Sequence, residues 1–327
     1  MSRTRLRRGR AVRECHTGTS CDGADAVAGA RGRIVGPVVT CSRFLLPLVC
    51  LAALAPAAAQ ATPTMAERRL CGAAPVFDDE FDTLNLSAWT LGAARWITHT
   101  PWAGDFGDAR FTDPGPGSAF AVHDGTLSIT ARKDAQGHWT SGLLASADED
   151  GHGFTTMYGY FETRVKLPPG PGTWPGVWLN ESTPPNWMRP TVEVDAIEYY
   201  GQFTDAFHST VHVWPGRSSE PHGGATQLNS VPPKSLVDDF HTYGTLVTPR
   251  WIRLYLDHKE YWQTPTPPQH RLPFMFLVNL ALGSGWPIDK TPNPTVMLVD
   301  YVRAYQPADP EAFARCLVAG APPRAPR

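Results

Sequence analysis

Between residues 71 and 306, short runs rich in β-branched and aromatic residues alternate with breaks made of Gly, Pro, Asn and Asp. Runs of this kind are typical of strands joined by tight turns. No run of helical length interrupts them, and no repeat period is present. We therefore predict an all-β fold, a sandwich or jelly roll of two antiparallel sheets. The expected strands lie at 119–122, 126–131, 158–167, 174–179, 191–201, 207–214, 242–248, 251–256, 274–282 and 296–305, and a short C-terminal helix is expected at 310–319.

The run at 191–201 contains three carboxylates, Glu193, Asp195 and Glu198. Strand side chains alternate between two faces, so Glu193 and Asp195 share one face and the intervening valines share the other, buried face. Strict alternation would bury Glu198 and expose Ile197, and both placements are costly. One extra residue bulged out beside Ile197 corrects both. The sequence therefore predicts a β-bulge that brings all three carboxylates to one open face.

Carboxylates held together in this way suit acid–base or nucleophilic work at a glycosidic bond. One carboxylate attacks or activates water, while a second, protonated one delivers its proton to the leaving oxygen. The middle Asp195 can share a proton with a neighbour and so separate the pKa values of the two glutamates. A short acidic string is also typical of a solvated surface or a structural cation site. The acidic string alone does not distinguish a catalytic site from a solvated surface or a structural cation site.

The front of the chain reads as targeting sequence rather than as part of a working domain. Residues 44–61 contain an apolar run after Arg43 and end in a small-x-small cleavage pattern, and the run is too short for a comfortable membrane span. Residues 1–43 are rich in arginine and lack lysine, as expected of a translation start placed too far upstream or of a basic nucleic-acid arm. We expect residues 1–61 to be an extension plus signal peptide that the mature protein lacks. Residues 62–327 would then form one domain of a secreted or periplasmic protein.

The cysteines fit export. Cys71 and Cys316 are the two that remain after residue 61, one near each end of the expected domain, and no cysteine spacing resembles a metal site. In an exported domain the simplest reading is one disulfide between them. Two separate thiols are the alternative.

Several tryptophans are flanked by Gly or Pro, namely Trp174, Trp178, Trp187, Trp214 and Trp286. Sugar rings stack their C–H faces on aromatic rings, although a buried tryptophan is more often part of the core. Trp174 and Trp178 share a face of an extended segment, and His212 lies on the strand expected to follow the acidic one, where it would contact the sugar or tune Glu193. The candidate substrate-binding residues are therefore Trp174, Trp178, His212, Trp214, Trp286 and Asn279.

Several longer motifs together resemble glycoside hydrolase family 16, in the order in which that family carries them. They are Phe77-Asp-Asp-Glu-Phe81, Tyr158-Gly-Tyr-Phe-Glu-Thr-Arg, Gly172-Thr-Trp-Pro-Gly-Val-Trp-Leu, Glu193-Val-Asp-Ala-Ile-Glu198, Phe240-His-Thr-Tyr, Asn279-Leu-Ala-Leu-Gly283 and Val299-Asp-Tyr-Val-Arg-Ala-Tyr. The resemblance implies a concanavalin-like β-jelly-roll and an endo-acting β-glycanase that retains configuration through a covalent glycosyl-enzyme. By this likeness Glu193 is the nucleophile, Asp195 its electrostatic assistant and Glu198 the general acid/base. The bulge resembles the longer form of the family motif, seen in laminarinase- and agarase-like members, whereas bacterial lichenases carry the shorter form.

Two segments depart from the family pattern where the cleft is expected. Residues 186–192 lack the glycine that commonly precedes the first glutamate. Residues 96–114, where laminarinases carry an asparagine-rich stretch, instead contain Trp102-Ala-Gly-Asp-Phe-Gly-Asp108. The likeness favours a β-1,3- or β-1,3-1,4-glucan, and these departures leave the polysaccharide open.

The resemblance further implies a structural calcium ion on the convex side, held by Glu80, the carbonyl of Gly125 and Asp300. Hard oxygen ligands of this kind suit calcium. The alternative is that the two acids only form hydrogen bonds between terminal strands. No cofactor is expected for catalysis.

The net charge of −2 gives no electrostatic case for a nucleic-acid partner. We expect a polysaccharide substrate, no stable membrane span and a monomer. Two other functions use the same scaffold. One is a transglycosylase, in which an acceptor sugar replaces water; the other is a carbohydrate-binding jelly roll without turnover, which predicts the loss of one glutamate.

Overall fold

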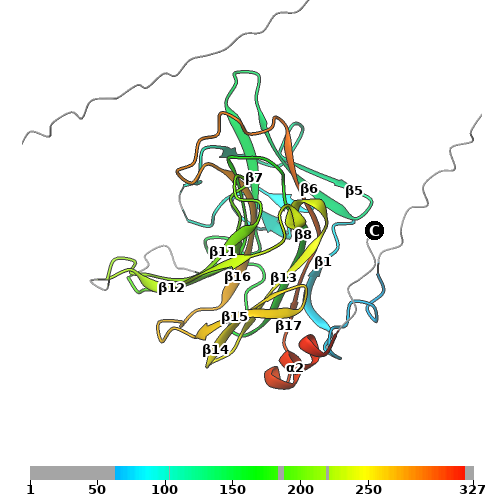
Figure 1. Ribbon diagram of the computed structural model, residues 1–327, viewed down its shortest axis with the longest axis vertical. Coiled ribbons are helices and arrows are strands. Elements are labelled where there is room, and N and C mark those ends of the chain that lie inside the picture. The colour runs from blue at the N-terminus through cyan, green and yellow to red at the C-terminus, as the bar shows by residue number, and fades with distance from the viewer. Residues whose placement is uncertain (1–62, 103, 183–187, 219–220, 321–327) are drawn as a thin grey trace, which may run out of the picture. The chain divides into compact units, whose positions relative to one another are not determined.

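The strands form two layers that pack face to face, with β9, β10, β11 and β16 in one layer and β8, β13 and β17 in the other (Figure 1). The computed structural model describes residues 63–102, 104–182, 188–218 and 221–320. These residues belong to one compact unit, residues 57–327. The predicted extension and signal peptide at 1–61, and Trp187, lie outside the described residues.

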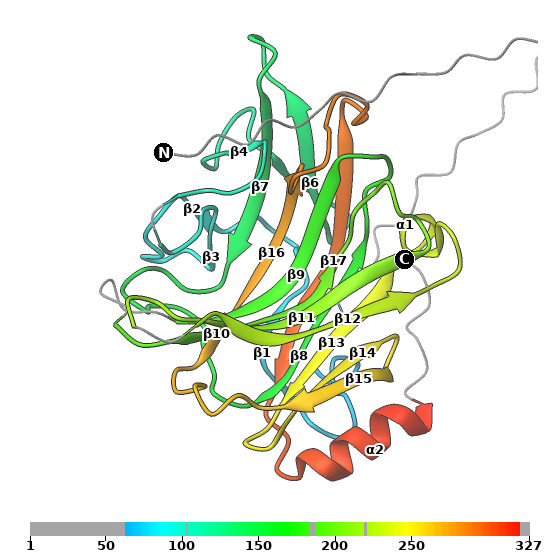
Figure 2. The same ribbon diagram turned by 60° about the vertical axis from the view of Figure 1, so that its left-hand side comes forward.

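The first sheet carries the acidic strand near its middle (Figure 2). Its order from one edge is β12 (Gly223–Ser230), β11 (Ala206–Trp214), β10 (Thr191–Glu198), β9 (Thr173–Glu181), β16 (Phe274–Leu282), β7 (Trp139–Ala145), β3 (Trp96–Ile97) and β2 (Leu86–Ser87). The long strands pair antiparallel; the short β2 runs parallel to β3, and β4 (Arg110–Phe111) runs parallel to β7.

The second sheet lies behind the first, and β17 forms its centre. Its order is β15 (Lys259–Pro265), β14 (Trp251–Leu256), β13 (His241–Val247), β8 (Gly159–Lys166), β17 (Thr295–Tyr305), β6 (Thr126–Lys133) and β5 (Phe120–His123), with β1 (Pro75–Asp79) beside the last part of β17. Strands β6 and β7 pair with each other and so connect the two sheets. The described helices are α1 (Ser235–Asp238) and α2 (Pro310–Gly320).

Apolar side chains from the facing sides of both sheets form the main core. Val192, Val194 and Ile197 of β10 are fully buried there, together with Phe161 of β8 and Phe276 of β16. Burial of whole aliphatic and aromatic side chains in this way is the principal stabilising contribution of a sandwich. Because one side of β10 faces the core, the other side is left for the carboxylates.

The predicted fold class is confirmed, and the predicted strands recur with ends shifted by at most two residues, except that the acidic strand ends at Glu198, three residues earlier than predicted. Three long strands were missed. β7 is buried on both faces and shows no alternation, β12 is polar and glycine-rich at a sheet edge, and β15 begins directly after a two-residue turn. Alternation of apolar and polar residues does not identify a strand whose two faces are both buried or both exposed to solvent.

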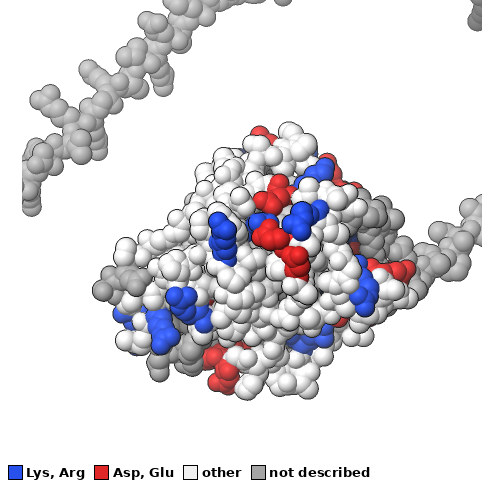
Figure 3. All heavy atoms as spheres, turned by 90° about the horizontal axis from the view of Figure 1, so that it is seen from below, with Lys and Arg blue, Asp and Glu red and all other residues white. Residues whose placement is uncertain are grey.

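Helix α2 lies against the outer face of the second sheet and is tied to the N-terminal segment. Cys316 of the helix forms a disulfide with Cys71, as predicted, and Phe313 and Leu317 pack with Leu70 beneath it. Neither described helix is long and apolar enough to cross a membrane. On the face seen in Figure 3, side chains of both charge signs lie next to one another on a largely uncharged surface.

Candidate active site

Strand β10 contains the predicted bulge. The consecutive residues Val177 and Trp178 of β9 pair with Ile197 and Asp195, so Ala196 has no counterpart on that strand. The register with β11 shifts at the same place. The prediction of an extra residue between Asp195 and Ile197 is therefore confirmed, and it returns the later carboxylate of the strand to the open side.

The bulge is held by hydrogen bonds to its exposed carbonyl group. The oxygen of Ala196 accepts hydrogen bonds from the hydroxyl groups of Ser209 and Tyr261, each 2.8 Å long. Asn229 donates a further bond to the Ser209 oxygen at 3.1 Å. A bulge removes one carbonyl from the regular ladder, so side chains of β11, β12 and β15 supply the missing donors.

Glu193 and Asp195 form the inner part of the acidic face. The indole nitrogen of Trp214 donates a 3.0 Å hydrogen bond to Glu193 Oε2. Asp195 is only 3% exposed, and His212 Nε2 lies 3.3 Å from its Oδ2. The sequence placed His212 beside the acidic strand, and in the structure it contacts the middle acid directly.

Burial and mutual repulsion change the acidity of this pair. Burial, followed by the charge of Asp195, raises the pKa of Glu193 well above its ordinary value, against the opposing effects of His212 and Trp214. Burial, followed by the charge of Glu198, likewise raises the pKa of Asp195, and a side-chain hydrogen bond joins Asp195 to Glu193. Two carboxyl groups can share a hydrogen bond only through a proton. The raised pKa values of both carboxyl groups favour a pair that holds one proton, which either member can carry.

Glu198 is half-buried and receives its contacts from a different side. Trp174 Nε1 and the Tyr200 hydroxyl group donate to its Oε1, at 3.3 and 3.5 Å. Both donors use the same oxygen, so a proton carried by Glu198 would sit on Oε2. Tyr200 was not predicted, yet it follows Glu198 by two residues and strand parity puts the two on one face.

Two predicted sugar contacts need correction. Trp178 is 8% exposed and donates a 2.8 Å hydrogen bond to Asn279, which is itself only 2% exposed. The rings of Trp102 and Phe106 pack on Trp178 from outside, at centroid distances of 6.2 and 6.0 Å. Because Trp102 and Phe106 cover Trp178, Trp178 and its partner Asn279 form the support of the groove rather than its open surface.

Trp286 lies where a ligand can reach it. It is 43% exposed and meets the equally exposed Phe203 edge to face, with the ring centroids 5.0 Å apart. Trp214 is 37% exposed beside Glu193, and Trp174 is half-buried between Phe106 and Tyr200. Exposed aromatic surface of this kind marks a binding face on a soluble protein.

Two groups of side chains bear on metal binding. One oxygen each of Glu193 and Asp195 and one nitrogen of His212 lie within 4.8 Å of one another, close enough to share an ion, although acid–base chemistry explains the same arrangement. At the expected calcium position, both oxygens of Glu80 accept from Arg303, and Asp300 accepts from Arg164 at 2.7 Å. The ligand chemistry there suits calcium, but guanidinium groups already balance both charges. The calcium ion stays a prediction.

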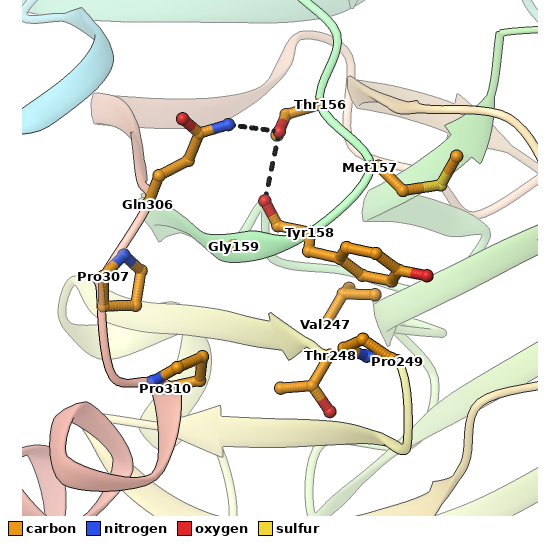
Figure 4. Close-up of a pocket in the computed structure, with 10 residues that line it drawn as sticks. All are labelled: Thr156, Met157, Tyr158, Gly159, Val247, Thr248, Pro249, Gln306, Pro307 and Pro310. Carbon is orange, nitrogen blue, oxygen red and sulfur yellow. Dashed lines mark hydrogen bonds between the residues drawn. The ribbon is translucent and has the colours of Figure 1, made fainter.

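A separate pocket of about 300 Å³ lies beside the N-terminal end of α2 (Figure 4). Tyr158 and the prolines Pro249, Pro307 and Pro310 form much of its wall. Its lining contains no carboxylate and no imidazole. The pocket offers nothing for proton transfer, so the acidic face of β10 is the candidate active site.

Known proteins are similar to this chain in sequence and in fold. The sequence pattern of the family described as Glycosyl hydrolases family 16 matches residues 110–303. An endo-1,3-1,4-beta-glycanase of Rhizobium meliloti is 32% identical over 70% of this chain and 51% of its own length, so the chain spans about half of that relative. Among solved structures, the endo-beta-1,3-glucanase of Pyrococcus furiosus superposes with a TM-score of 0.56 at 28% identity, over 72% of this chain and 96% of that one. The laminarinase catalytic domain of Thermotoga maritima gives a TM-score of 0.56 at 25% identity, over 72% and 98%.

Proposed function

This chain belongs to glycoside hydrolase family 16, and from that premise we propose that it is an endo-acting β-glycanase that cleaves a β-1,3- or β-1,3-1,4-glucan with retention of configuration. The observation that carries the proposal is the bulged strand β10, which presents Glu193, Asp195 and Glu198 on one face. Each glutamate has its own indole donor, and the raised pKa values of Glu193 and Asp195 suit the aspartate to share a proton with Glu193.

In the first step, Glu193 attacks the anomeric carbon. The shared proton rests on Asp195, which leaves Glu193 as the anion, and the Trp214 N–H group and His212 stabilise that charge. A bond forms between a carboxylate oxygen of Glu193 and the sugar while the glycosidic bond breaks. Glu198 gives its proton to the departing oxygen, so no free alkoxide is released.

In the second step, Glu198 acts as a base. It takes a proton from water as the water oxygen attacks the anomeric carbon, and the bond from Glu193 breaks. Glu193 returns to its anionic form and Glu198 regains its proton, so the cycle closes without a cofactor. Two displacements at one carbon restore the original configuration.

The preference for a glucan rests on relatives and on the aromatic groove. Relatives of about 30% identity carry the names endo-1,3-1,4-beta-glycanase and glucan endo-1,3-beta-glucosidase. Exposed Trp214 and Trp286, and half-buried Trp174, offer faces on which glucose rings stack. We also propose export of the protein, because the sequence at 44–61 has the form of a signal peptide and a disulfide suits an oxidising compartment.

The test is to incubate the purified protein with laminarin, mixed-linkage glucan, agarose and carrageenan and to follow the first anomer released by NMR. We expect internal cleavage of laminarin or mixed-linkage glucan, with the β-anomer appearing first. Release of the α-anomer first would refute the nucleophile assignment and make Glu193 a base that activates water. Transfer products in place of new reducing ends would identify a transglycosylase.

Variants assign the two glutamates. Glu193→Gln should abolish the covalent intermediate. Glu198→Ala should retain the first step on substrates with activated leaving groups, and added azide should then accelerate the second. Glu149→Gln, at an exposed position outside the site, is the matched control and should behave as wild type.

A further inference from the structure

His99, directly beyond the short strand β3, lies between two carboxylates. Its Nδ1 is 3.0 Å from Asp105 and its Nε2 is 2.8 Å from Asp113. The ring is 4% exposed and stacks on Trp89 at a centroid distance of 3.9 Å. None of the catalytic steps above uses this cluster.

The hydrogen bonds of His99 define its charge. An ionised carboxylate only accepts hydrogen bonds, so both ring nitrogens must carry a hydrogen for both contacts to form. Both contacts are therefore hydrogen bonds only when His99 is an imidazolium ion. Burial alone would lower the pKa of His99, but the hydrogen bonds with Asp105 and Asp113 outweigh it and raise that pKa above its ordinary value.

Asp105 directly precedes a residue of the groove wall. The ring of Phe106 packs edge to face on Trp174 at 5.4 Å and on Phe111 at 5.2 Å. Trp174 in turn donates to Glu198. The side chain of Phe106 thus fixes the ring that contacts the expected proton donor.

The far end of this segment is anchored separately. The Asp108 N–H group donates a 2.9 Å hydrogen bond to the carbonyl oxygen of Leu282, at the end of β16. Gly107 has φ +76°, and a Cβ atom there would lie 2.7 Å from the same oxygen, so only glycine fits this close approach. With Asp108 fixed to β16, the residues just before Phe106 are anchored by the contact between Asp105 and His99 and by a 2.8 Å hydrogen bond from the Thr100 hydroxyl group to the Gly104 carbonyl oxygen.

We propose that His99, as an imidazolium ion, is a positioning residue that holds Phe106 against Trp174 and so shapes the groove wall beside Glu198. The proposal rests on the proposed glycanase function only for its kinetic consequence. The charged groups that face the ring are Asp105 and Asp113, and Trp89 covers one of its faces. Because the charged form of His99 makes both contacts, Phe106 is held in place at pH values below the pKa of His99. As the pH rises through that pKa, Phe106 is held less firmly.

The direct test is the ¹⁵N NMR spectrum of the His99 ring in the intact protein. We expect both ring nitrogens to be protonated at pH 7. Asp113→Asn removes one acceptor charge at a side chain that is 70% exposed, so the fold is retained, and the pKa of His99 should fall. A ring protonated on one nitrogen only, or a titration unchanged by Asp113→Asn, would overturn the proposal.

Kinetics then test the connection to the groove. His99→Gln and Phe106→Leu should each raise KM for the polysaccharide by roughly two- to thirtyfold, the range observed for residues that act through a packed neighbour, with a smaller effect on kcat. The KM values of Asp113→Asn should rise at lower pH than those of wild type. His138→Gln is the control, since His138 also faces a carboxylate, with its Nδ1 3.7 Å from Asp134, but its side chain is 79% exposed. A higher KM in Phe106→Leu together with unchanged KM in both His99→Gln and Asp113→Asn would refute the role of His99.

Failure of the proposed function is distinguishable from failure of this inference. If the wild-type protein cleaves none of the glycans, the function fails, while the NMR titration of His99 still reports its charge. Tryptophan fluorescence of wild type and Asp113→Asn across the same pH range then reports whether the wall follows that charge. A tryptophan fluorescence that does not change with the titration of His99 would count against the inference.

Discussion

Trp214, the last residue of β11, donates a 3.0 Å hydrogen bond to Glu193 on β10. This contact lowers the pKa of Glu193 against the upward effects of burial and of Asp195. Trp214→Phe keeps most of the ring but removes the donor, so the pKa of Glu193 should rise further. Glu193 must be ionised to attack, so the acidic limb of the profile of kcat/KM against pH should move to higher pH. An unmoved limb would contradict the prediction, and Trp251→Phe, in the other sheet, is the control.

Two tryptophans should respond in opposite ways to truncation. Trp178 is buried, so Trp178→Ala should lower the free energy of unfolding by about 3–5 kcal/mol. Trp286 is 43% exposed, so Trp286→Ala should leave stability almost unchanged and weaken oligosaccharide binding by about 1–3 kcal/mol, by analogy with stacking of bases on aromatic rings. Urea denaturation and calorimetric titration measure the two effects. Loss of stability in Trp286→Ala with unchanged affinity would reverse its assignment.

The disulfide between Cys71 and Cys316 closes a loop with a sequence separation of 245 residues. Replacing both cysteines by serine should lower the free energy of unfolding by about 5 kcal/mol, because the unfolded chain regains its freedom. Helix α2 should become the first element to exchange its amide hydrogens, since its remaining anchors are the packing of Phe313 and Leu317 and one ion pair between Glu311 and Arg253. Titration of the unreduced protein should detect no thiol from this pair. Two free thiols there would rule out the bridge.

Glu162 of β8 should make stability sensitive to acid. Its buried carboxylate accepts hydrogen bonds from His258 at 2.7 Å and from the Tyr301 hydroxyl group at 2.8 Å. Burial raises the pKa of Glu162, but these contacts outweigh it and the pKa lies below its ordinary value. The stabilisation is therefore complete above the ordinary value of 4.5 and is lost as the pH falls through the lower, folded-state value.

Urea midpoints between pH 3 and pH 7 measure this effect. Glu162→Gln should destabilise the protein at neutral pH and flatten the decline in stability toward acid. Glu149→Gln, at an exposed position, should leave the curve unchanged. An equally steep acid decline in Glu162→Gln would place the sensitivity elsewhere.

The fold and the acidic strand were predictable because each depends on local pattern. Alternation along β10 failed at one place, and the failure itself located the bulge beside Ile197. The disulfide followed from the position of two cysteines. The support residues Trp178 and Asn279 were assigned wrongly because the sequence does not indicate that Trp102 and Phe106 cover Trp178, to which Asn279 is hydrogen-bonded.

Contacts made within irregular segments had no sequence signal. His99, Asp105 and Asp113 lie in a stretch without periodicity, so no spacing indicated that one ring meets two acids. Strand parity extended past Glu198 would have found Tyr200. Such pairings depend on the tertiary course of the chain, which local rules do not encode.

The hydrogen bonds at the carbonyl of Ala196 bear on how this strand can evolve. Deleting that one residue would yield a regular strand, but it would remove the carbonyl acceptor that the hydroxyl groups of Ser209 and Tyr261 share and leave these groups with only the 2.9 Å hydrogen bond between them to accept one proton. Tyr261 belongs to the opposite sheet, so the accompanying changes would have to arise in both layers together. A lineage carrying the longer strand is therefore separated from one carrying the shorter strand by a barrier that no single deletion crosses. Among proteins descended from a common ancestor with this bulge, we expect the length of the strand to vary less than the identity of the residue at the bulge.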